Sequence, residues 1–241
     1  MRWDPTPTYG GGFDFWKIKI DNSIGQIDEA TVFGDPNRYP SSFTTFIEPS
    51  TGLNLLAYFG SNVNLGKENT SGVDFDLVYR HAFSFGNFRT NLFGTYIFKR
   101  EYEVVPGQGY FDDVGKFING DMTAPLRLKW NNVLSAGDWE HTIGFNYMSS
   151  YDDDRDNSVL DLATNKFVSI EQNVKSYMTW DWQTQWQLVK NLKVTAGIFN
   201  IFNAKPPLSI TTNGGGQMIG YNADFSNPQD RTWYGNVTLK F

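Results

Sequence analysis

The sequence has no cysteine among its 241 residues and only two histidines, His81 and His141. A disulfide framework, a thiolate metal site and a cysteine nucleophile are therefore excluded. Charged residues are also scarce (19%), and the acidic ones outnumber the basic ones to give a net charge of −6. We expect no nucleic-acid partner, because this balance leaves no broad basic surface.

Long apolar runs are missing as well. The long uncharged stretch from Pro49 to Gly66 is interrupted by Ser, Thr, Gly and Asn, and it does not predict a spanning helix. No apolar segment of a signal peptide follows Met1 to Pro5. These absences do not exclude a transmembrane β-barrel, because inward-facing polar residues keep the mean hydropathy of such barrels low.

Aromatic residues are plentiful (17%), and apolar residues alternate with polar ones in many segments. In residues 177–188, Trp180, Trp182 and Trp186 fall on one face of an extended strand, while aspartate and glutamine fall on the other. The same alternation predicts eight strands, around residues 16–21, 73–80, 88–99, 126–131, 143–147, 177–188, 192–198 and 233–241.

The predicted connections alternate in length. Tight turns are expected at Ser84–Asn87, Ala136–Asp138 and Lys190–Asn191. The remaining connections are long, at about 22–60, 102–122, 151–173 and 204–230. Short turns at one end and long loops at the other are typical of an outer-membrane barrel, with periplasmic turns and extracellular loops. A soluble antiparallel sandwich is the alternative, because strand alternation alone fits both.

The pattern also assigns the two faces of the strands. In the first strand, Trp16, Ile18 and Ile20 are expected to face outward. The inward faces are expected to carry the charged residues Lys17, Asp74, Arg80, Arg89, Arg127, Lys129 and Asp181. A closed eight-stranded interior would need these charges paired, whereas in a larger barrel they would face a plug or water.

Three stretches carry a resemblance to a family. They are Asn62–Lys67 together with Thr70–Phe75, then Gly197–Pro207 with its Asn-Ile-Phe-Asn core and Pro-Pro, and Asp230–Phe241 with its terminal aromatic. They resemble TonB-dependent outer-membrane receptors. The resemblance implies an all-β antiparallel barrel of about 22 strands with a plugged lumen. Residues 1–241 would be its C-terminal part, with the plug domain and signal peptide absent.

The resemblance implies a function and partners. The expected function is TonB-energised uptake of a scarce solute across the Gram-negative outer membrane, of the ferric siderophore, cobalamin or oligosaccharide class. The expected partners are outer-membrane lipid, a small-molecule ligand, the barrel assembly machinery, and TonB through the missing N-terminal region. An eight-stranded outer-membrane protein with a structural, adhesive or small-solute role is the alternative.

Candidate ligand contacts lie in the long loops, where this family binds substrate. They are Tyr102, Tyr110, Phe111, Asp112, Asp113, Tyr221, Asn222 and Asp224. Candidate residues for barrel assembly or closure are Asn200, Phe202, Asn203, Trp233 and Phe241. The resemblance implies that Phe241 is a recognition end for assembly.

Catalytic and metal chemistry find little support in the pattern. No Gly-x-Ser-x-Gly elbow accompanies the two histidines, so an enzyme is not expected. No cofactor is expected either. The acidic cluster Asp152, Asp153, Asp154 and Asp156 suits a hard cation, but its spacing is not that of an EF-hand, and a solvated loop is the preferred interpretation.

Overall fold

The computed structural model describes residues 1–22, 24–27, 29–60, 62–64, 66–103, 107, 109–118, 122–153, 158–169, 171–210, 220–223 and 225–240. The chain divides into two compact units. The first comprises Met1–Trp16, Ser71–Lys99 and Asp113–Phe241. The second comprises Lys17–Thr70 and Arg100–Asp112.

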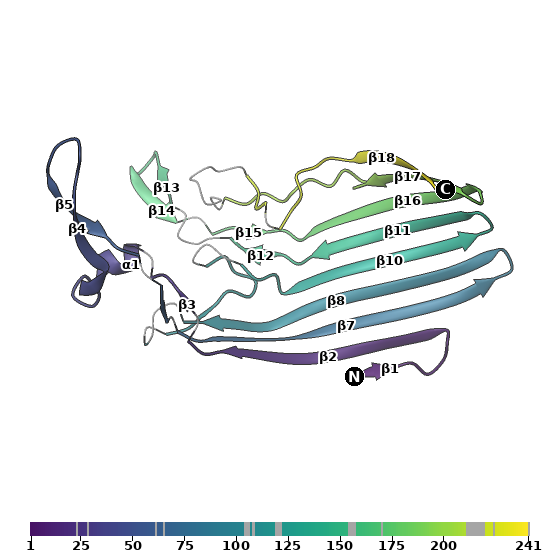
Figure 1. Cartoon of the computed structure of the whole chain (residues 1–241), viewed down its shortest axis with the longest axis horizontal. Coiled ribbons are helices and arrows are strands. Elements are labelled where there is room, and N and C mark those ends of the chain that lie inside the picture. The colour runs from purple at the N-terminus through teal and green to yellow at the C-terminus, as the bar shows by residue number, and fades with distance from the viewer. Residues whose placement is uncertain are drawn as a thin grey trace. The chain divides into compact units, whose positions relative to one another are not determined.

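One antiparallel sheet organises the protein, and its strands follow one another in chain order (Figure 1). The order is β1 (Arg2–Trp3), β2 (Tyr9–Ile20), β7 (Glu68–Phe83), β8 (Gly86–Tyr102), β10 (Leu126–Ala136), β11 (Trp139–Met148), β16 (Tyr177–Val189), β17 (Leu192–Phe199) and β18 (Thr232–Leu239). The short β9 (Phe111–Asp112) pairs with β8. All eight strands that the alternation predicts are present.

The predicted tight turns are confirmed. They join β7 to β8, β10 to β11, and β16 to β17, and they lie together at one end of the strands (Figure 1). In the second turn, Gly137 has a φ of 57°, a left-handed conformation that glycine adopts without steric cost.

The sequence pattern missed β1 and the turn that follows it. β1 has only two residues, and they pair with Gly12 and Gly11 of β2. In the turn, Thr6 Oγ1 accepts hydrogen bonds from the backbone N–H of Thr8 (3.2 Å) and of Tyr9 (3.3 Å). Too few residues precede the turn for an alternating pattern to be recognised.

The long connections contain secondary structure of their own. Residues 21–67 hold β3 (Ile24–Gly25), α1 (Glu29–Gly34), a 3-10 turn (Pro40–Ser42), β4 (Phe43–Ile47), β5 (Asn54–Tyr58) and β6 (Val63–Asn64). Residues 149–176 hold β12 (Tyr151–Asp152), β13 (Ser158–Asp161), β14 (Lys166–Ser169) and β15 (Asn173–Val174). Among the described residues, no helix has the length and apolarity needed to cross a membrane.

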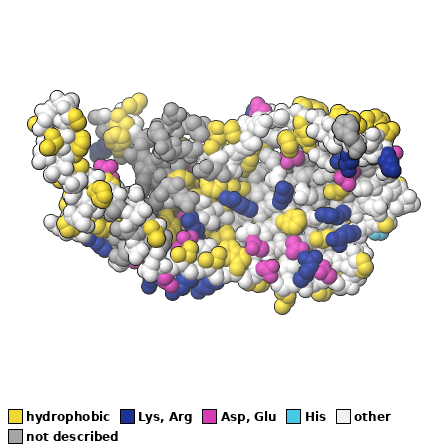
Figure 2. All heavy atoms as spheres, viewed as in Figure 1, with side chains coloured by type: hydrophobic (Ala, Val, Ile, Leu, Met, Phe, Trp, Pro, Cys, Tyr) yellow, Lys and Arg dark blue, Asp and Glu magenta, His cyan; other side chains and the backbone are white. Residues whose placement is uncertain are grey.

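The two faces of the main sheet differ sharply. On the apolar face, the Trp180 ring contacts Phe145 and Trp130, with ring centroids 4.6 Å and 6.2 Å apart. On the polar face, Asn146 Nδ2 donates to Asp181 Oδ2 at 3.1 Å. Figure 2 shows basic and acidic side chains gathered over the main sheet on the side in view. The alternation of the sequence therefore corresponds to a real separation of faces.

Trp16 corrects one detail of the predicted faces. A β-carbon added to Gly72 would lie 2.6 Å from Trp16 Cζ2, so the indole covers that glycine. Gly72 shares the polar face with Asp74, because alternate residues of a strand point the same way. Trp16 thus lies on the polar face, and Phe13 and Phe15 take the outward positions of β2. By the same alternation Lys17 shares the outward face with Phe15, so its predicted inward position is wrong. Ile18 and Ile20, predicted outward, share the face of Trp16.

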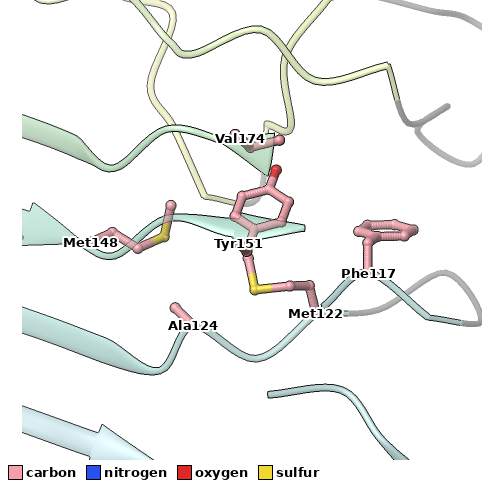
Figure 3. Close-up of a cluster of buried hydrophobic side chains, with 6 residues drawn as sticks. All are labelled: Phe117, Met122, Ala124, Met148, Tyr151 and Val174. Carbon is pink, nitrogen blue, oxygen red and sulfur yellow. The ribbon is translucent and has the colours of Figure 1, made fainter. Parts of the chain in front are cut away.

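Buried apolar residues are few among those that the structure describes, and they do not lie between two sheets. Apart from Val32, they form one cluster at the bases of the long connections: Phe117, Met122, Ala124, Met148, Tyr151 and Val174 (Figure 3). The apolar face of the main sheet instead exposes large side chains such as Phe98 and Trp233. A soluble sandwich would bury such a face, so this alternative fails.

Candidate functional site

The cluster of buried residues at the loop bases is centred on Tyr151. In Figure 3 its ring lies between Met122 and Val174, which come from different connections. Tyr151 follows β11 directly and pairs with Val174 in the β12–β15 ladder. The side chains of the cluster therefore join the connection after β8 to the connection after β11.

Backbone hydrogen bonds reinforce this junction. The Phe117 N–H donates to the carbonyl of Asp152 at 2.8 Å, and the Asp152 N–H donates to the carbonyl of Gly115 at 2.8 Å. Asp152 Oδ1 also accepts a hydrogen bond from Asn173 Nδ2 at 3.0 Å. Because these bonds connect segments far apart in sequence, the loop bases form one hydrogen-bonded layer at the ends of the strands.

Asp153 ties a third connection, residues 200–231, to this layer. Its side chain is 1% exposed. One carboxylate oxygen accepts from Ser209 Oγ at 3.2 Å, and the other accepts from the Ile210 N–H at 2.7 Å. The expectation of a solvated acidic loop is therefore wrong for Asp153. Asp154 and Asp156 lie outside the described residues.

The hydroxyl of Tyr151 belongs to the same polar group. It is hydrogen-bonded to the side chains of Ser209 and Asn222. Burial raises the pKa of Tyr151 above its ordinary value, and the negative charge of Asp153 acts in the same direction, whereas the two hydrogen bonds lower it. The neutral phenol is therefore the form that the loop-base cluster stabilises.

The predicted ligand contacts in this unit lie at different depths. Asp113 is fully buried, and its Oδ2 accepts a hydrogen bond from Thr123 Oγ1 at 3.2 Å. Asn222 is also buried, and its carbonyl accepts from Ser226 Oγ at 2.8 Å. Tyr221 is half-buried. Asp113 and Asn222 hold the loops in place, and Asp224 lies outside the described residues.

The other predicted ligand contacts form a small group in the second unit. Tyr102 and Phe111 face each other across the β8–β9 ladder, with ring centroids 6.1 Å apart. The Arg100 guanidinium lies over the Tyr102 ring at 5.5 Å, and the Arg100 N–H donates to Asp112 Oδ1 at 3.4 Å. Tyr110 is exposed beside them. The structure thus brings four of the predicted residues together.

The Asn-Ile-Phe-Asn motif forms the exit from β17. Asn200 is buried with a φ of 54°, and its N–H donates to Asp181 Oδ1 at 2.8 Å. Its side-chain amide donates to the Ala204 carbonyl at 2.9 Å and accepts from the Ala204 N–H at 2.8 Å. Asn203 also has a φ of 54°, and its Oδ1 accepts from the Arg231 N–H at 2.9 Å.

The remaining predicted assembly residues are exposed or not described. Phe202 and Trp233 are both largely exposed. Trp233 lies on the apolar face of β18, opposite Ile198 of β17. Phe241 lies outside the described residues. A role of these residues in assembly stays a prediction.

The histidines take part in aromatic contacts on the apolar face. His81 packs edge-on against Phe83, with centroids 4.4 Å apart, and His141 stacks on Trp139 at 6.0 Å. His141 Nδ1 also lies 2.9 Å from Thr184 Oγ1. Among the described residues, no group of three or more acidic or histidine side chains is placed to hold a metal ion.

This arrangement has a counterpart among known families. It combines an ordered meander of long strands with short turns at one end and joined loops at the other. Residues 1–201 match the family described as TonB dependent receptor-like, beta-barrel. The chain belongs to this family. Its members are receptors of the outer membrane of Gram-negative bacteria, and this membrane is the location of the barrel segment.

Solved structures of TonB-dependent receptors share the fold. The outer membrane transporter YddB from Escherichia coli has a TM-score of 0.59 and 15% identity, and the match covers 100% of this chain and 31% of YddB. The siderophore receptor PirA from Acinetobacter baumannii has a TM-score of 0.60 and 12% identity, covering 98% of this chain and 30% of PirA.

A third structure is a mutant ferric enterobactin receptor, PfeA from Pseudomonas aeruginosa, in complex with enterobactin. It has a TM-score of 0.63 and 16% identity, covering 98% of this chain and 30% of the receptor. This chain therefore spans less than a third of the length of these receptors. No curated protein sequence matches it.

Membership of the family assigns the two faces of the sheet. In a transmembrane barrel the apolar face contacts lipid and the polar face lines the lumen. The short turns then lie in the periplasm, and the loop-base cluster lies at the extracellular end. The sequence pattern did not identify Tyr151 as part of that cluster, nor Ser209 and Ile210 as partners of Asp153. The one signal near them was the acidic run that begins at Asp152.

Proposed function

We propose that this chain is the C-terminal wall of a longer TonB-energised receptor that imports a ferric siderophore. The observation that carries the proposal is the match to the receptor-barrel family over residues 1–201. The coverage of about 30% of the solved receptors agrees with a segment of a larger barrel. In this proposal, a plug domain occupies the lumen and TonB acts on it from the periplasm.

The open edges of the sheet support a larger barrel over a closed eight-stranded one. Within the part of the chain that the structure describes, the path of the main sheet ends at β1 on one side and at β18 on the other. An unpaired strand edge in lipid leaves backbone N–H and C=O groups unsatisfied, at a cost of several kcal/mol each. Further strands of the same receptor would satisfy both edges.

The loops supply a surface whose chemistry suits such a ligand. Tyr110 and Phe111 are exposed, and Tyr102 carries the Arg100 guanidinium over its ring. Aromatic rings beside a guanidinium, which also pairs with Glu68 at 3.2 Å, suit an aromatic chelate of iron. Enterobactin is the ligand in one of the similar structures, and so it is the probe that we choose.

The test is uptake of radioactive ferric enterobactin by cells that express the full-length gene product. We expect uptake to require TonB and to fall in a Tyr110→Ala, Phe111→Ala double variant. The matched control is Phe85→Ala, an exposed phenylalanine in the periplasmic turn between β7 and β8.

Each outcome has a distinct meaning. TonB-dependent uptake of cobalamin or an oligosaccharide in place of ferric enterobactin would show that the proposed ligand class is wrong. A gene product near 27.5 kDa, with no TonB-dependent uptake, would overturn the receptor function itself and favour a small barrel.

A further inference from the structure

The lipid-facing side of the sheet is hollowed where β1, β2, β7, β8 and β10 lie side by side. The hollow has a volume of about 480 Å³, which is in the range of small-molecule pockets. Its walls include Trp3, Tyr9, Phe13, Leu77, Tyr79 and Trp130. No charged side chain is among the described residues that line it.

A glycine creates the floor of this hollow. Gly11 shares the outward face of β2 with Tyr9 and Phe13, since alternate residues of a strand point the same way. A β-carbon on Gly11 would lie 2.7 Å from the Asp76 carbonyl oxygen and 2.9 Å from Leu77 Cδ2. Because Gly11 has no side chain, the Leu77 side chain lies against its backbone, and both residues form a low floor between the rings of Tyr9 and Phe13.

Hydrogen bonds hold Trp130 of β10, which forms the wall of the hollow farthest from β2, in place. The Trp130 indole N–H donates to Thr90 Oγ1 at 2.6 Å, and the Thr90 hydroxyl donates to Asn132 Oδ1 at 2.8 Å. The polar groups of this wall are thereby engaged, and the indole is held in one orientation. A preformed apolar surface binds a hydrocarbon with a smaller loss of conformational entropy than a mobile one.

The hollow lies in the periplasmic half of the barrel wall. Tyr9 begins β2 directly after a periplasmic turn, and Tyr79 lies close to the end of β7 at Phe83. His81 stacks on Tyr79 with centroids 6.2 Å apart, on the side of the turn. Rings with polar tips at this level are typical of the membrane–water interface.

We propose that this hollow binds one acyl chain of a glycerophospholipid of the periplasmic leaflet, with the head group at the level of Tyr9 and His81. The hollow is continuous with the surface that faces lipid, so the acyl chain reaches it without leaving the membrane. The hollow extends across four neighbouring strands, β2, β7, β8 and β10, a distance of about 15 Å at the usual strand spacing. Because the acyl chain comes from the bilayer and not from water, close van der Waals packing against these rings supplies the binding free energy.

The experiment is native mass spectrometry of the full-length gene product, extracted from outer membranes in a mild detergent. Two variants change the hollow in opposite ways. The double variant Tyr79→Ala, Trp130→Ala removes its walls, and Leu92→Trp fills it. The matched control is Tyr147→Ala, Trp186→Ala, which removes the same two side-chain types from the same face outside the hollow. Heat-dependent migration on a gel reports whether each variant folds.

We expect the wild type to retain a phospholipid that is identified by its fragment masses. Both hollow variants should retain it about tenfold less, and the control pair should match the wild type. Equal retention in the hollow variants and the wild type would mean adventitious annular lipid and would overturn the proposal. Retention of lipopolysaccharide alone, or a dimer that Leu92→Trp dissociates, would show a different occupant and would overturn it too.

Discussion

The Asp153 carboxylate accepts the backbone N–H of Ile210 at 2.7 Å, across 57 positions of sequence. Both residues lie in long connections at the extracellular end of the strands. The side chain of Asp153 is almost wholly inaccessible to solvent, and its second oxygen accepts from Ser209. This one carboxylate therefore fixes the start of the last loop to the base of the preceding one.

Asp153→Ala should release the last loop while leaving the strands paired. A buried N–H that loses its acceptor costs about 1–3 kcal/mol, and the cost falls on the loop layer, not on the main sheet. We expect faster proteolysis between residues 200 and 231, with an unchanged heat-dependent gel shift of the barrel. Proteolysis mapped by mass spectrometry is the measurement.

Asp21→Ala is the control for this experiment. Asp21 is exposed and forms a surface ion pair with Lys19 at 3.4 Å, and such pairs contribute little. If Asp153→Ala and Asp21→Ala were cleaved at the same rate as the wild type, Asp153 would not be the residue that anchors the last loop.

Alternation of polar and apolar residues predicts most of the strands because each face of the sheet meets a different solvent. Trp180 and Asp181 illustrate this, since one faces lipid and the other accepts hydrogen bonds on the polar side. The same rule fails at Trp16, where the space above Gly72 admits an indole on the polar face. A local vacancy of this kind depends on strand register, which alternation alone does not specify.

The loop-base cluster could not be predicted in the same way. Tyr151, Ser209 and Asn222 come from distant segments without periodicity, and their contacts depend on how the loops fold back. The acidic run at Asp152 and Asp153 was visible, but a run of carboxylates is usually a solvated feature. The burial of Asp153 results from tertiary packing, which the composition of the acidic run does not predict.

Tyr151 should titrate later than an ordinary tyrosine. Burial raises its pKa, so the folded cluster favours the neutral phenol. The associated stability is fully present below the unfolded-state pKa of about 10 and is lost as pH rises through the folded-state value. The ultraviolet absorbance of phenolate should be titrated in the wild type and in Tyr151→Phe. The difference between the two titrations should show one phenol that ionises above a pH of about 10.

Tyr151→Phe also tests the hydroxyl at neutral pH. It removes the hydrogen bonds to Ser209 and Asn222 while keeping the ring against Met122 and Val174. We expect a loss of about 1 kcal/mol in the loop layer. A difference titration centred at or below the ordinary tyrosine value would contradict the burial of this phenol.

Asn200 should be sensitive to substitution for two separable reasons. Its side chain makes two hydrogen bonds to Ala204, and its φ of 54° is a conformation that asparagine and glycine tolerate better than alanine. Asn200→Ala loses both contributions, whereas Asn200→Gly loses only the hydrogen bonds. Urea unfolding in detergent should rank the wild type first, Asn200→Gly next and Asn200→Ala last. A reversed order of the two variants would remove the backbone argument.

Gly197 and Tyr234 form a pair in which the absence of one side chain makes room for another. A β-carbon on Gly197 would collide with Cζ and the hydroxyl oxygen of Tyr234, which itself donates to Gln183 Oε1 at 2.9 Å. Gly197→Ala should therefore displace the ring and cost about 1–3 kcal/mol.

Tyr234→Ala loses the ring but leaves space for the new methyl group. The double variant should accordingly lose less than the sum of the two single losses in urea unfolding, because the collision cannot occur once the ring is gone. Strict additivity would mean that β17 and β18 accommodate the methyl group without moving Tyr234.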